Sequence, residues 1–322
     1  MFKRLIPDPF ILVLLGTIAV ASLFPASGDG LTFASHLSNV AIFSLFFFHG
    51  LRLAHQSVWD GLKHWRLQGA VMLCTFALLP LMGLSFATLA TPWLSPELWL
   101  GVLFLCVLPS TVQAAIASSS MAGGNVAASV IAAALSNLAG VMLTPLLFAA
   151  IAHAGGGQID LSTVWRIAQL LLFPFILGQI AQRWLSAWAA RHKAWISRLD
   201  KSTIVITVFV TFSAATNEGL WQRLSLPEMG RLLLLVIVLL TLAMSAAWWL
   251  GRALGFSPAD RATLLFSGAH KSLATGAPMA RILFPAAQAG MIVIPLMLYH
   301  QLQLMVSAWI AARLGQHALS PD

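Results

Sequence analysis

One stretch of this chain places a basic and a titratable side chain inside a strongly apolar sequence. It reads "SGAHKSLATGAP" over residues 267–278 and holds His270 beside Lys271. A lysine far from both membrane surfaces is costly unless it finds partners or water, so it commonly marks a substrate contact, an ion pathway or a proton relay. The chemistry predicted here is the binding of an anion or the handling of a charge, and not covalent catalysis.

A second polar stretch reads "LPSTVQAAIASSS" over residues 108–120. Thr111 and Gln113 follow Pro109, which lacks a backbone donor and interrupts a helix. Hydroxyl and amide groups beside such a break can bind a small ligand, whereas the serines further along suit packing between helices. We therefore take Thr111 and Gln113 as binding candidates.

Lys271 and His270 also have ordinary structural explanations. A lysine near the end of a helix can extend its ammonium group to the membrane surface. Lys271, however, is ten residues from both Arg261 and Arg281. Ten helical residues span about 15 Å, or half of a bilayer. A functional role is therefore favoured for Lys271, while His270 fits a polar contact between helices as well as it fits substrate or proton handling.

The composition excludes several other classes of function. None of the ten Asp and Glu residues lies in the middle of an apolar segment, which argues against a sodium site or proton relay built on a buried carboxylate. Cys74 and Cys106 are too few for a disulfide framework or a metal site. No nucleotide-binding loop, zinc-ligand spacing or basic run with interleaved aromatic residues is present. We expect no enzyme activity, no cofactor, no metal and no nucleic-acid partner.

The elements that position these residues are predicted to be membrane-spanning helices. Of the 322 residues, 59% are hydrophobic and only 9% are charged. In soluble domains, roughly a quarter of all residues are charged. Apolar segments of about 17–25 residues can cross a bilayer as helices. Ten such spans are predicted: 9–25, 35–53, 67–91, 97–122, 124–153, 162–188, 201–217, 229–254, 257–283 and 286–314. The expected fold class is an all-α polytopic membrane protein in a lipid bilayer.

The basic residues predict how these spans are oriented. If both termini are cytoplasmic, 13 of the 18 Lys and Arg residues fall on the cytoplasmic side and four on the other, as the positive-inside rule requires. The remaining basic residue is Lys271, which belongs to neither side. We expect a multi-pass protein with cytoplasmic N- and C-termini, and the short loops favour a bacterial inner membrane.

Ten spans divide into two halves of five, residues 1–153 and 154–322. Because five is odd, the second half crosses the membrane in the opposite direction, which predicts an inverted repeat with a site near the midplane. The fourth span of each half, 97–122 and 257–283, is interrupted. The residues expected to break these two helices are Pro109, Gly268, Gly276 and Pro278.

Three motifs carry a resemblance to a known family. They are "LPSTVQAAIASSSMAGGNVAAS" over 108–129, "LTPLL" over 143–147 and "HKSLATGAPMA" over 270–280. Over nearly its whole length the chain resembles the bile acid:sodium symporter superfamily, and most of all its atypical branch, which includes the seventh vertebrate solute-carrier-10 member and bacterial transporters. The resemblance implies a panel domain of spans 1, 2, 6 and 7 and a core domain of spans 3–5 and 8–10, where the broken spans four and nine cross.

The chain departs from the sodium sites that the resemblance implies. The position of a sodium-binding Glu falls on Phe266, that of a Gln on His270 and that of an Asn on Lys271. A Gln of span three falls on Thr75, while a Ser of span five is retained as Ser129. Sodium coupling is therefore expected to be lost or changed. Lys271 is expected to replace the cation and to hydrogen-bond with carbonyl groups of span four.

The expected function is alternating-access transport of a small organic anion. The candidate substrate-binding residues are Thr111, Gln113, His270, Lys271, Ser272 and Thr275, and the candidate ion-coupling residues are Lys271, His270, Thr75 and Ser129. Two alternatives are a proton- or cation-coupled antiporter and a membrane regulatory protein, linked to ion homeostasis, that no longer transports. The two helix breaks argue against the regulatory protein, because breaks cost stability and would have no use there.

Overall fold

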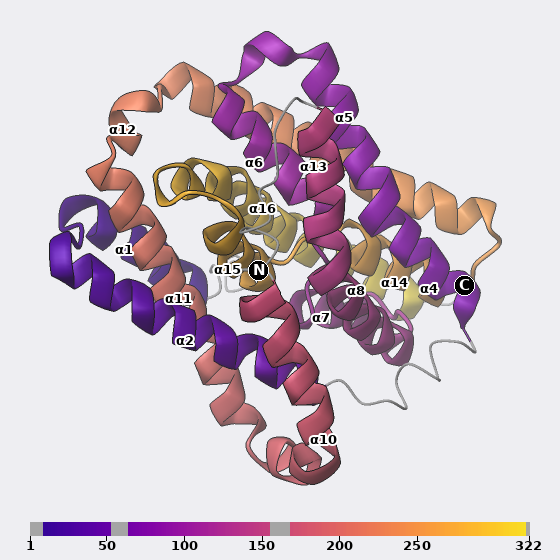
Figure 1. The fold of residues 1–322 in the computed structure, drawn as a ribbon. Helices are drawn as coiled ribbons and strands as arrows, with labels where there is room; N and C mark the ends of the chain where they lie inside the picture. The colour runs from indigo at the N-terminus through magenta and orange to yellow at the C-terminus, as the bar shows by residue number, and fades with distance from the viewer. Residues whose placement is uncertain (1–8, 53–63, 155–167, 320–322) are drawn as a thin grey trace. The chain divides into compact units, whose positions relative to one another are not determined.

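The computed structural model of this chain describes residues 9–52, 64–154 and 168–319, whose regular structure is entirely helical (Figure 1). Within these ranges, seven helices are long and apolar enough to cross a membrane: Gly28–Arg52, Trp65–Leu89, Val126–Ile151, Gln169–Arg191, Lys193–Asn217, Leu226–Ala253 and Gln288–Gln316. The protein is thus an all-helical polytopic membrane protein. The arrangement of ten spans as two inverted repeats stays a prediction.

Five of the long helices are continuous. They are α2 (Gly28–Arg52), α8 (Val126–Ala154), α11 (Lys193–Asn217), α13 (Leu226–Ala253) and α16 (Ala286–Leu319). Two more contain a π turn: α4 (Trp65–Leu73), η2 (Cys74–Leu78) and α5 (Leu79–Leu89) form one, and η4 (Ala168–Leu172) and α10 (Phe173–Arg191) form the other. In both, a proline follows the π turn, Pro80 in α5 and Pro174 in α10. A residue without an N–H group explains why the regular hydrogen-bond ladder is offset there.

Shorter helices complete the described chain. They are α1 (Pro9–Leu23), η3 (Thr91–Trp93), α6 (Pro96–Val107), α7 (Gln113–Met121), α12 (Leu220–Arg223), α14 (Pro258–Ala269) and α15 (Leu273–Leu283). Predicted span four therefore consists of two helices, α6 and α7, and predicted span nine consists of α14 and α15. The prediction that each of these two segments is interrupted agrees with the helix bounds.

The two breaks have different local causes. Leu108 leaves the α6 helix in an extended conformation, with φ −70° and ψ 153°, because it precedes Pro109. His270 leaves α14 in a similar conformation, with φ −72° and ψ 149°. The expectation that Gly268, Gly276 and Pro278 break this segment was wrong. Gly268 lies within α14 and Gly276 and Pro278 lie within α15, where a proline removes one hydrogen bond without ending the helix.

The described residues fall into two compact units. The first lies within Met1–Ala54, Ala149–Leu226 and Ala274–Ile294. In it, α2 lies alongside both α10 and α11, and α1 lies against α11 (Figure 1). The second lies within His55–Phe148, Pro227–Leu273 and Pro295–Asp322. In it, α14 contacts α4, η2 and α7, and α5 packs against α6. Both helix breaks belong to this second unit.

Glycines let α2 and α10 approach closely in the first unit. A Cβ atom added at Gly50 of α2 would overlap the Phe175 carbonyl oxygen, and one added at Gly178 of α10 would overlap the Phe47 carbonyl oxygen. The two backbones therefore touch where each helix presents a glycine, as is common between membrane helices.

We expect Gly178→Ala to lower the stability of the protein by about 1–3 kcal/mol, because the new methyl group forces two backbones apart. Thermal unfolding of the purified protein in detergent measures this loss. Gly230→Ala is the matched control, since a Cβ atom there meets nothing within 4 Å. Equal melting temperatures for the two variants would contradict the close packing of α2 and α10.

Candidate functional site

The side chain of Lys271 is completely buried within the second unit. Its Nζ atom donates hydrogen bonds to the carbonyl oxygens of Thr75 at 2.9 Å, Cys106 at 2.7 Å and Leu108 at 2.7 Å. An ammonium group has three N–H donors and no acceptor, so these three bonds use its full capacity. The sequence prediction that Lys271 hydrogen-bonds with carbonyl groups of span four is confirmed for Cys106 and Leu108.

The Thr75 carbonyl is available to Lys271 because of the π turn in which it lies. The N–H group of Leu79 donates to the Cys74 carbonyl, five residues back, and not to Thr75. The next possible donor in a π turn is residue 80, which is a proline and has no N–H group. The helix thus leaves one buried carbonyl oxygen without a partner from its own ladder, and Lys271 supplies the missing donor.

The carbonyls of Cys106 and Leu108 are available because α6 ends at Val107. Pro109 has no N–H group, and the Ser110 N–H donates to Ser136 Oγ at 2.9 Å instead of to Cys106. Buried carbonyl groups need donors. The Lys271 ammonium group donates to two carbonyl groups at this helix end and to a third carbonyl group in η2. It therefore links predicted spans three, four and nine by hydrogen bonds.

Helix α16 supplies hydrogen bonds for the backbone of the second break. Gln303 accepts from the Lys271 N–H at 2.8 Å and donates to the Lys271 carbonyl at 2.9 Å, so one side-chain amide satisfies both groups of one residue. The Tyr299 hydroxyl donates to the Ala269 carbonyl at 2.7 Å. The Ser272 N–H donates to the Pro109 carbonyl at 2.9 Å, which joins the two breaks directly.

Helix α8 gives corresponding support to the first break. Besides the bond from Ser110 to Ser136, Asn137 Nδ2 donates to the Ser110 carbonyl at 3.1 Å, and Thr144 Oγ1 donates to the Val107 carbonyl at 2.8 Å. Gly140 lies between these residues, and a Cβ atom there would overlap the Pro109 ring. Each broken span is therefore held by polar side chains of the helix that follows it.

His270 connects the start of α7 to α16. Its Nδ1 atom lies 3.1 Å from Thr111 Oγ1, and its Nε2 atom lies 2.7 Å from Ser307 Oγ. Thr111 Oγ1 also accepts from the Ala115 N–H at 3.1 Å. A hydroxyl can donate or accept, so either tautomer of the completely buried imidazole is satisfied. Of the roles considered for His270, this geometry fits the polar contact between helices.

The other candidate residues lie in different environments. Gln113 is the first residue of α7 and its side chain is exposed. Ser272 and Thr275 are buried, at the second break and in the first turn of α15. Ser129 Oγ lies 3.3 Å from Ser267 Oγ of α14. At Thr75 the main chain and not the hydroxyl meets Lys271, and the buried Oγ1 atom has no partner among the described residues.

Sequence reasoning overlooked the residues that hold the second break. Tyr299, Gln303 and Ser307 recur every fourth position of α16, so they form one stripe along this helix. Ser136 and Thr144 are eight residues apart and share a face of α8 in the same way. A search for polar residues spaced by four in apolar spans would have found the stripe of α16.

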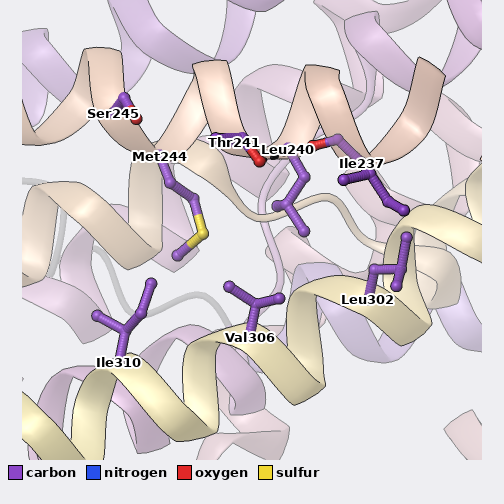
Figure 2. Close-up of a pocket in the computed structure, with 8 residues that line it drawn as sticks. All are labelled: Ile237, Leu240, Thr241, Met244, Ser245, Leu302, Val306 and Ile310. Atoms are coloured by element: carbon purple, nitrogen blue, oxygen red, sulfur yellow. Dashed lines mark hydrogen bonds between the residues drawn. The ribbon is translucent and has the colours of Figure 1, made fainter. Parts of the chain in front are cut away.

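The surface of the second unit also carries a groove of about 160 Å³ between α13 and α16. In Figure 2, Leu240 and Met244 of α13 point toward Val306 and Ile310 of α16. The lining offers only the hydroxyls of Thr241 and Ser245 as polar groups and carries no charge. It suits an apolar chain, so the candidate site for an anionic ligand remains at the two breaks. In the described ranges no cluster of His, Cys, Asp and Glu could hold a metal ion.

We expect Gln303→Leu to destabilise the protein by about 1–3 kcal/mol, because the buried Lys271 N–H group loses its acceptor, whereas the Lys271 carbonyl keeps His300 Nδ1 at 3.2 Å. Thermal unfolding in detergent measures the effect. Gln301→Leu is the control on the same helix, because the buried Oε1 atom of Gln301 has no partner among the described residues. A Gln303→Leu protein as stable as the control would contradict the amide clamp.

Comparison with known proteins places the sequence of this chain in a family. The sequence matches the SBF-like CPA transporter family (DUF4137) over residues 8–316. An uncharacterized protein of Pseudomonas aeruginosa is 43% identical over 311 residues, which cover 96% of this chain and 93% of that protein. YfeH of Escherichia coli (strain K12), described by its name as a candidate symporter, is 43% identical over 309 residues, with coverage of 95% and 92%. Sodium/bile acid cotransporter 7 of Mus musculus is 25% identical over 334 residues, with coverage of 97% and 96%. The resemblance to the bile acid:sodium symporter superfamily is confirmed.

Proposed function

Because the chain belongs to the SBF-like CPA transporter family, we propose that it carries a small organic anion across the membrane by alternating access and without sodium coupling. It is a transporter of the bile acid symporter type. The anionic substrate and the absence of sodium coupling are our inferences from the Lys271 site.

The observation that carries the proposal is the position of the Lys271 ammonium group. It is completely buried, and its three partners are neutral carbonyl oxygens. None of these partners carries a negative charge that would neutralise the ammonium group where the two broken spans meet. A second cation bound close by would be repelled, because charges interact strongly in a medium of low polarity. Phe266 supports the same conclusion, since its buried ring packs against His270 and offers no oxygen to an ion.

The same charge favours an anionic substrate. All three Lys271 donors are used by carbonyl groups, so the lysine acts on an anion through its field and not through a direct hydrogen bond. The exposed side chain of Gln113 at the start of α7 can make the direct contact. A helix N-terminus carries partial positive charge and unpaired N–H groups, which adds to the attraction for an anion.

Two features support alternating access by an inverted-repeat carrier. The described residues divide into two compact units, and alternating access requires two bodies that can move. The polar stripe of α8 behind the first break is matched by the stripe of α16 behind the second. We propose that the chain forms ten spans in repeats 1–153 and 154–322. We also propose an inner-membrane location with both termini in the cytoplasm, on the basis of the distribution of Lys and Arg.

We expect a panel of small organic anions to contain a ligand that raises the melting temperature equally in sodium chloride and in choline chloride. A ligand at 100 times its dissociation constant stabilises the folded state by about 2.7 kcal/mol. Gln113→Ala should reduce the shift, whereas Ser120→Ala, at an exposed position near the end of α7, should leave it unchanged. A shift that requires sodium and disappears in Ser129→Ala would overturn the proposal.

We expect Lys271→Gln to abolish uptake of that ligand into proteoliposomes at every pH between about 5.5 and 8.5, because the fixed charge is lost. Uptake is measured with the labelled ligand, and wild-type protein run in parallel at each pH is the control. Retained uptake that has lost its pH dependence would instead identify a proton-coupled carrier, in which Lys271 cycles a proton.

A further inference from the structure

We infer that the carbonyl oxygens of Thr75, Cys106 and Leu108 form a site for one monovalent ammonium-type cation, which the side chain of Lys271 fills from within the chain. The inference predicts that the protein binds a free alkylammonium ion once that side chain is shortened. It concerns cation binding and stability alone, so it holds or fails independently of the proposed transport of an anion.

The three oxygens come from separate points of the chain and converge on one atom. They lie 2.9, 2.7 and 2.7 Å from Nζ, within the ordinary range for charge-assisted N–H···O bonds. Thr75 is left unpaired by the π turn and Pro80, and Cys106 and Leu108 are left unpaired by the end of α6.

Other contacts keep the two carbonyl groups at the end of α6 in place when the ammonium group is absent. Val107, between two of the acceptors, is held by Thr144, and Ser110 is held by Ser136 and Asn137. These bonds do not involve the Lys271 side chain. Thr75 lies within the helical segment η2, so this part of the site is organised before its cation arrives, which lowers the cost of binding.

The chemistry of the site selects the class of cation. Rings of backbone carbonyl oxygens can replace the hydration shell of a monovalent cation. The N–O distances of 2.7–2.9 Å suit an ammonium ion, which can direct one N–H group at each oxygen. Mg²⁺ requires oxygens at about 2.0–2.1 Å and keeps its own water, so this set of neutral oxygens excludes it. An ion without N–H groups, such as tetramethylammonium, offers no donors to these three carbonyl acceptors.

Lys271→Ala defines the free ligand that fits. The substitution keeps Cβ and removes three carbons and the ammonium nitrogen, and n-propylammonium supplies the same four heavy atoms. It enters a channel that the lysine stem formerly filled, and it restores donors to three carbonyl groups that are otherwise buried and unpaired. Because the site is completely buried, the amine is present from membrane extraction onward.

The experiment measures thermal unfolding of purified Lys271→Ala in detergent against increasing n-propylammonium chloride, with tetramethylammonium chloride at the same ionic strength as reference. We expect a saturable rise of roughly 5 °C when the amine is far above its dissociation constant. Wild-type protein should show no such rise, because its own ammonium group fills the site. Lys271→Met should show none either, because its side chain fills the channel without supplying a donor. Lys193→Ala, which shortens an exposed lysine, controls for effects at the surface.

Two results would overturn the inference. One is the absence of a saturable rise in Lys271→Ala, and the other is an equal rise in all four proteins. If Lys271→Ala does not survive purification in ordinary buffer, recovery of monodisperse protein becomes the readout. Recovery with n-propylammonium but not with tetramethylammonium supports the site, whereas equal recovery, or recovery with neither, rejects it.

Discussion

Two helices of this protein break inside an apolar environment, and every backbone group freed at the breaks needs a partner there. That requirement governs the second unit of the structure, because an unpaired N–H or carbonyl group away from water is costly. The Lys271 ammonium group meets part of this requirement, because its three N–H groups donate to three carbonyl oxygens. A charge that would be expensive by itself becomes the cross-link between spans three, four and nine.

The polar residues of the neighbouring helices can be understood in the same way. Ser136 and Thr144 of α8 hold the first break, and Tyr299 and Gln303 of α16 hold the second. Their hydrogen bonds allow the breaks to exist without water. Two helices, α7 and α15, therefore begin within apolar segments of the chain. A soluble protein places such irregular structure at its surface.

Sequence reasoning located the apolar helices and the two interrupted spans, because hydropathy and proline act locally. It placed the second break wrongly, on Gly268, Gly276 and Pro278, because glycine and proline are tolerated within a helix when the rest of the ladder is kept. The break lies at His270 to Ser272, where contacts from α16 and from Pro109 replace the helical bonds. Contacts across more than thirty residues leave no local signal.

The sequence alone indicated a multi-pass transporter of the bile acid symporter type, and its count of Lys and Arg residues singled out Lys271 as the one basic residue assigned to neither membrane face. Only the tertiary structure decided what Lys271 binds. Its partners are the main-chain carbonyl groups of Thr75, Cys106 and Leu108. The side chains of these three residues take no part in the contacts, so their residue types do not predict them. Every residue has a carbonyl group, so a site built from backbone oxygens becomes visible only when the folded chain brings them together.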